Sequence, residues 1–127
     1  KAHSYHWNVE GKDFSQLHDF FGDLYEEIFE AVDTASEQLR VLDGYAPFSL
    51  MDLYEHKTVN EDTAKPATSA EMLKNLQEAN DKVIESLNKL FDTATAEKKQ
   101  GLADFAAGRL DVHNKHGWMI RSHLKGQ

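Results

Sequence analysis

The sequence contains no cysteine among its 127 residues. Disulfide bonds and thiolate metal sites are therefore excluded, and cysteine usage leaves the redox compartment open. No apolar run approaches the roughly 20 residues that a membrane-spanning helix needs, and no signal peptide is visible. A Gly-rich phosphate loop, a nucleophile elbow and a basic stripe are also missing. We expect a cytoplasmic location. These absences fit the cytoplasm, and they would fit other places as well.

Basic residues are few. The 22 acidic and 14 basic residues leave a formal charge of -8, which should repel nucleic acid and attract cations. The 40% apolar content is enough for one hydrophobic core. We therefore expect a single domain over residues 1–127.

Proline is almost absent, and both prolines, Pro47 and Pro66, lie in one central connection. Elsewhere apolar residues recur at helical spacing, without the alternation typical of strands. Asp13 with Gln16, and Thr68 with Glu71, have the spacing of capping boxes that begin helices, and Gly44 is a plausible helix end. The expected helices cover residues 1–8, 14–44, 48–56, 68 to about 94, and about 96 or 102 to 124.

These helices predict an all-α protein. Residues 1–8 have the pattern of the last turns of a helix that begins before this sequence, so the first helix is expected to be truncated. Two helical hairpins joined by a long crossover, which carries the short helix 48–56, form a ferritin-like four-helix bundle.

Two kinds of metal ligand stand at helical spacing. Asp33 and Glu37 are four residues apart, so their carboxylates are neighbours and repel each other unless a cation joins them. A solvated acidic face is the commoner explanation of such a pair. The pairs His3 with His6, and His113 with His116, are each three apart and have the spacing to chelate zinc, copper or iron. Neither has a nearby carboxylate box, so a structural role is the alternative.

The stretch from His6-Trp-Asn to Leu17-His18 resembles the signature of the Dps family of mini-ferritins. Asp33-Thr-Ala-Ser-Glu37 and Lys115-His-Gly-Trp-Met119 are similar to further stretches of that family, and the resemblance covers essentially the whole chain. It implies a shell of twelve subunits that oxidises Fe(II) with hydrogen peroxide or dioxygen and stores the ferric mineral.

The resemblance also implies a ligand set at the two-fold interface of two subunits. His6 and His18 of one subunit and Asp33 and Glu37 of the other would bind up to two irons, with zinc as a substitute. Glu37 would bridge the irons, and Trp7 would pack nearby.

One position departs from the family, which usually has an aspartate four residues after the second histidine. Here that residue is Gly22, which costs a helix about 1 kcal/mol relative to alanine and so needs a local reason. Asp23 is turned by about 100°, and Glu26 lies one turn further on. We expect the second iron position to be weakened, with Asp23 and Glu26 as extra candidate ligands.

Outside the centre, Asp104 matches the position of a pore aspartate, although an ordinary exposed acid is the alternative. Many members of the family bind DNA through basic arms, but the charge of this chain predicts no DNA binding by these residues. Two alternatives to a ferroxidase remain, a non-enzymatic metal-sequestering shell and a DNA-compacting protein with a degraded ferroxidase site.

Overall fold

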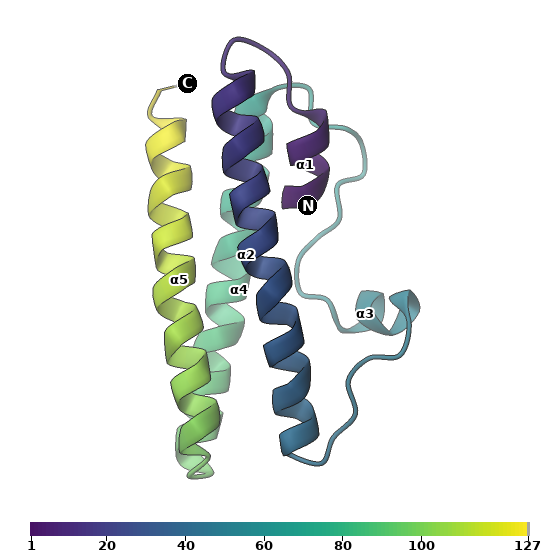
Figure 1. Ribbon diagram of the computed structural model, residues 1–127, viewed down its shortest axis with the longest axis vertical. Coiled ribbons are helices and arrows are strands. Elements are labelled where there is room, and N and C mark those ends of the chain that lie inside the picture. The colour runs from purple at the N-terminus through teal and green to yellow at the C-terminus, as the bar shows by residue number, and fades with distance from the viewer. Residues whose placement is uncertain (127) are drawn as a thin grey trace. The chain divides into compact units, whose positions relative to one another are not determined.

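The computed structural model describes residues 1–126 and contains five helices and no strand over that range. Figure 1 shows the helices in chain order: α1 (Ala2–Asn8), α2 (Phe14–Val41), α3 (Leu50–His56), α4 (Ser69–Ala96) and α5 (Gln100–Leu124). The chain forms two compact units, one over Lys1–Thr58 and one from Val59 onward. The expectation of a single domain stays a prediction. Over residues 1–126, no helix is long and apolar enough to cross a membrane.

In the first unit, α1 packs beside the N-terminal part of α2 (Figure 1). The connection turns at Gly11, whose φ of 110° is a conformation that glycine adopts without strain. Tyr5 and Phe21 are buried and meet edge to face, with ring centroids 5.8 Å apart. Val9 and Leu17 are buried as well. These apolar contacts hold the end of α1 against the beginning of α2.

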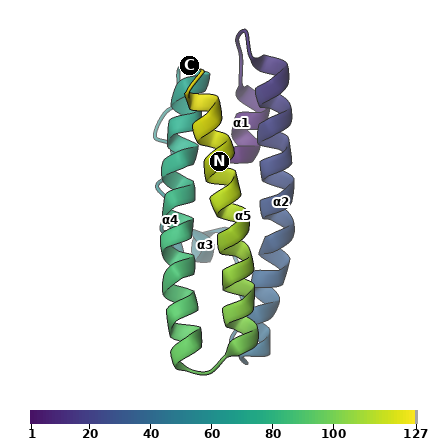
Figure 2. The same cartoon turned by 90° about the vertical axis from the view of Figure 1, so that its left-hand side faces the viewer.

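In the second unit, α4 and α5 form an antiparallel hairpin closed by a short turn (Figure 2). Both helices contribute buried apolar residues. These residues are Met72, Leu73, Leu76 and Ala94 on α4, and Ala103, Ala106 and Ile120 on α5.

The helix starts follow local side-chain chemistry in part. The capping box at the beginning of α4 is confirmed, because Thr68 Oγ1 accepts from Glu71 N and Glu71 Oε2 accepts from Thr68 N. The expected cap of α2 was wrong: Asp13 precedes the helix but makes no capping hydrogen bond. Its ψ of 19° differs from the extended backbone usual for a capping residue. Its carboxylate lies 3.8 Å from Lys12 Nζ instead.

The end of α2 differs from the expected stop at Gly44. The helix ends at Val41, and the left-handed residue is Asp43, with φ 66°. Gly44 N donates to Leu39 O and Asp43 N donates to Arg40 O, which is the Schellman pattern. Aspartate tolerates this conformation better than most residues, so the backbone reverses one residue before the glycine.

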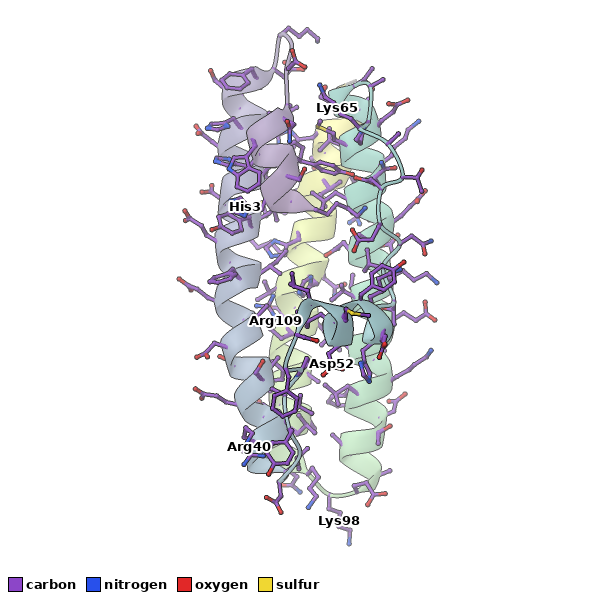
Figure 3. All side chains as sticks on the ribbon, turned by 90° about the vertical axis from the view of Figure 1, so that its right-hand side faces the viewer. His3, Arg40, Asp52, Lys65, Lys98 and Arg109 are labelled. Atoms are coloured by element: carbon purple, nitrogen blue, oxygen red, sulfur yellow. The ribbon has the colours of Figure 1, made fainter. Side chains whose placement is uncertain are left out.

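The end of α4 repeats this pattern with a less suitable residue. Lys98 has φ 58°, Lys98 N donates to Thr95 O, and Lys99 N donates to Ala94 O. Figure 3 shows Lys98 at the turn between α4 and α5. A left-handed backbone costs a residue with a Cβ roughly 1–2 kcal/mol. The turn is therefore a strained point of the hairpin.

We expect Lys98→Gly to stabilise the protein by about 1 kcal/mol, because glycine adopts this φ without the Cβ penalty. The measurement is the midpoint of denaturant unfolding of the full chain. Lys99→Gly is the matched control, since it removes the same charge from a residue with φ -89°. Equal midpoints for the two variants would contradict the assignment of strain to Lys98.

Candidate metal centre

The imidazoles of His6 and His18 lie face to face. His6 is on α1 and His18 is on α2, and their ring centroids are 3.9 Å apart with an interplanar angle of 16°. Both side chains are half-buried. The apolar contacts between the two helices bring the rings together, although the residues are twelve apart in sequence.

Each imidazole donates a hydrogen bond to the backbone of the other residue. His6 Nδ1 lies 2.6 Å from His18 O, and His18 Nδ1 lies 2.7 Å from His6 O. A carbonyl oxygen only accepts, so both Nδ1 atoms carry a proton. In the neutral rings the two Nε2 atoms then hold lone pairs.

This pattern has a metal-binding interpretation and a structural one. Histidines that bind metals commonly donate the other ring N–H to a backbone carbonyl, which fixes the tautomer and the ring orientation. The carbonyl of His6 also belongs to the last turn of α1, where it has no partner within the helix. His18 therefore caps α1 as well. The two functions are compatible, because capping uses Nδ1 and leaves Nε2 for a ligand.

The two acidic candidates lie far from this imidazole pair in the same chain. Asp33 and Glu37 are exposed on the C-terminal half of α2. Asp33 follows His18 by 15 residues on one continuous helix, which places their Cα atoms about 22 Å apart. Accordingly, no group of three or more His, Cys, Asp and Glu side chains with metal-binding geometry occurs among residues 1–126.

The remaining residues predicted for the centre, Asp23, Glu26 and Trp7, lie at exposed positions. Asp23 and Glu26 are exposed on α2. Trp7 is 65% exposed, and its ring centroid is 3.9 Å from that of His3. His3 in turn stacks on Tyr25, with centroids 3.6 Å apart and an interplanar angle of 9°. His3 and His6 therefore have different ring partners, and the sequence pattern did not reveal Tyr25 as the partner of His3.

In the second histidine pair, on α5, His113 belongs to a buried polar network. His113 Nδ1 donates to Asn80 Oδ1 at 2.9 Å, and Asn80 Nδ2 donates to the His113 carbonyl at 2.9 Å. Arg109 Nη2 lies 2.8 Å from His113 Nε2, which must accept because the guanidinium only donates. Both ring nitrogens of His113 thus bind protein groups. A chelating role with His116 is not supported, and the structural alternative is favoured.

Asp104 is exposed near the N-terminus of α5, where Gly101 is exposed as well. A pore forms only between copies of a chain, so its assignment to a pore stays a prediction.

Large apolar side chains are exposed on two helices of the first unit. Phe29 is 67% exposed and Val32 is 53% exposed on α2. On α3, Leu50 is 84% exposed and Met51 is 73% exposed. Large apolar side chains exposed together on one unit are a common feature of interaction sites. We call these four residues the apolar surface of the first unit.

Comparisons with known proteins give the family. The chain matches the model of the ferritin-like domain family over residues 1–126. It is 32% identical over 128 residues to a low temperature-induced protein of Nostoc, covering 100% of this chain and 72% of the relative. It is 27% identical to the DNA protection during starvation protein of Helicobacter pylori, covering 98% of this chain and 86% of the relative.

A solved structure agrees. Dps from Staphylococcus aureus matches with a TM-score of 0.91 at 28% identity, over 97% of this chain and 82% of that chain. The expected all-α, ferritin-like bundle is confirmed by this similarity. The chain belongs to the Dps family of ferritin-like proteins.

Proposed function

We propose that the protein is the subunit of an iron-storing ferroxidase whose centres form between two copies of the chain. His6 and His18 of one copy and Asp33 and Glu37 of the other bind Fe(II) as the substrate. The observation that carries this proposal is the reciprocally hydrogen-bonded pair of imidazoles, which keeps two Nε2 lone pairs for a ligand.

A second copy is needed because metal–ligand bonds are about 2 Å long and the two half-sites are about 22 Å apart on α2. No rotamer of His18 or Asp33 closes such a distance. A two-fold axis that pairs α2 with α2 of another copy in opposite directions brings the acids of each chain to the imidazoles of its partner. The interface is then the same patch on both copies.

The apolar surface of the first unit supports this pairing. Phe29 and Val32 lie on the same helix as the acids, four residues and one residue before Asp33. A second copy that covers them excludes water beside Asp33 and Glu37. In a drier surrounding the two carboxylates repel more strongly, so a bound cation is needed to neutralise them.

The donor set suits iron. Imidazole nitrogen and carboxylate oxygen together bind Fe(II) and Fe(III), and four protein ligands leave coordination positions for an oxidant. Hydrogen peroxide takes one electron from each of two ferrous ions and, with two protons, becomes water. Dioxygen is the other candidate oxidant. The chain supplies the ligands, and zinc is expected to compete for the same nitrogen atoms.

Storage of iron requires assembly of the subunits into a closed shell, as the family resemblance implies. We propose a twelve-subunit shell in which Asp104 lines an acidic path for Fe(II) and the ferric product mineralises inside. With a charge of -8, the chain should not hold DNA by counterion release, so the DNA-compacting alternative is disfavoured. A sequestering shell without oxidation is the second candidate, because Gly22 offers no carboxylate beside the imidazoles.

The test is Fe(II) oxidation by peroxide in the full chain and in the variants His18→Ala and Glu37→Ala. Loss of a group that only supports a metal ligand costs roughly 10–100-fold, so loss of a ligand should slow oxidation by at least about tenfold. Asp19→Ala, an exposed acid on α2, is the control and should keep the parent rate. Equal rates in all four proteins would contradict the proposed ferroxidase centre. Tight Fe(II) binding without oxidation in the parent would favour the metal-sequestering shell.

A further inference from the structure

Gly22 lies in the interior of α2 and is buried. A glycine weakens a helix relative to alanine, so its presence needs a reason. Backbone conformation is not the reason, because Gly22 does not have a positive φ and lies within regular helix. The remaining explanation is the space that its missing side chain leaves.

That space is filled by the His6 ring. A Cβ on residue 22 would lie 2.9 Å from His6 Nδ1 and 3.0 Å from His6 Cε1. Distances this short require one of the two groups to move. By contrast, a Cβ on Gly108 in α5 would have no other atom within 4 Å. The steric conflict at Gly22 is therefore with the His6 ring, and it is absent at an open helical glycine such as Gly108.

The His6 ring has little freedom to move away. Its Nδ1 is hydrogen-bonded to His18 O at 2.6 Å, and the ring stacks on the His18 ring with centroids 3.9 Å apart. The His18 carbonyl is the one that the helical ladder pairs with the amide of residue 22. The ring thus lies over the turn that a side chain at position 22 would occupy, and a shift outward breaks the hydrogen bond that fixes its tautomer.

We propose that Gly22 is a positioning residue that lets the His6 ring approach α2 closely and keeps its Nε2 lone pair beside that of His18. The metal-binding part of this inference rests on the proposed function. It follows that the imidazole half-site depends on two closely held nitrogen ligands and gains no carboxylate from its own helix turn. A carboxylate introduced at position 22 then has to displace His6 before it can bind a metal.

The first experiment needs no metal and measures thermal unfolding of the assembled, metal-free full chain. Gly22→Ala should lower the melting temperature, whereas the control Gly108→Ala should raise it, because alanine favours an open helical position. In a His6→Ala background the clash is gone, so Gly22→Ala should raise the melting temperature there. Such a change of sign is a coupling between the two residues. A rise in the parent equal to that of Gly108→Ala would overturn the proposal.

The second experiment uses Co(II) as a spectroscopic probe of the same proteins. Gly22→Ala and Gly22→Asp should each bind Co(II) about tenfold more weakly than the parent, as expected when the orientation of a ligand is lost, and Gly108→Ala should bind as the parent does. Tighter binding by Gly22→Asp would overturn the expected cost of a side chain at this position. If the thermal coupling appears but the parent binds no Co(II), the positioning role stands and the proposed metal site fails.

Discussion

Co-assembly of His18→Ala chains with Glu37→Ala chains should restore iron oxidation that each variant alone performs at least about tenfold more slowly than the parent. In a two-fold pair with one chain of each kind, one centre has lost both halves. The other centre keeps the imidazoles of the Glu37→Ala chain and the acids of the His18→Ala chain. Random pairing makes half of the pairs mixed, so the co-expressed protein should have about a quarter of the parent rate.

The control for this experiment combines two defects in the same half-site. His6→Ala chains co-assembled with His18→Ala chains contain no intact imidazole pair, so they should stay as slow as either variant alone. The measurement is the initial rate of Fe(II) oxidation by peroxide at equal shell concentration. Rates in the first mixture that equal the mean of its two components would refute a centre shared between copies.

Phe29→Lys separates the assembled shell into small species and removes oxidation. Phe29 is 67% exposed in the single chain, so a lysine there costs the isolated fold little. If a second copy covers this position, the substitution removes the burial of a large aromatic side chain, about 1.5–3 kcal/mol. It also buries an unpaired charge, which costs more. Because both copies of a two-fold interface carry the substitution, its cost is incurred twice in each pair.

Size-exclusion chromatography with light scattering measures this effect, and circular dichroism reports whether the helices persist. Glu30→Lys is the matched control, because it places the same side chain on an exposed residue of the next helical position. It should leave both the size and the oxidation rate near those of the parent. A Phe29→Lys protein that remains a full-sized, active shell would show that the apolar surface of the first unit is not an interface.

The sequence predicted the helices well where short-range chemistry decides them. The capping box of Thr68 and Glu71 joins residues three apart, and the structure confirms it. Asp13 and Gly44 are equally local signals but were less reliable. Asp13 has a backbone that is not extended, and the left-handed conformation at the end of α2 falls on Asp43. Local patterns therefore locate a helix end to within a few residues.

The polar contacts were harder to predict because their partners are distant in sequence. His113 is hydrogen-bonded to Asn80, 33 residues away on another helix, and nothing in the spacing of His113 and His116 indicates that partner. Gly22 was recognisable as a departure from a family pattern, but its contact with His6 depends on how α1 packs on α2. The site residues themselves were proposed from resemblance, and their assignment awaits the co-assembly experiment.

The separation of the two half-sites along α2 has a consequence for when the chemistry starts. Under the proposed pairing, a newly synthesised subunit carries two incomplete fragments and cannot oxidise anything, however much ferrous ion surrounds it. Reactivity appears only once two subunits have paired and completed a shared centre. The rate of iron oxidation in a cell would then rise steeply with the concentration of the protein. Single chains at low concentration would leave ferrous ion unoxidised.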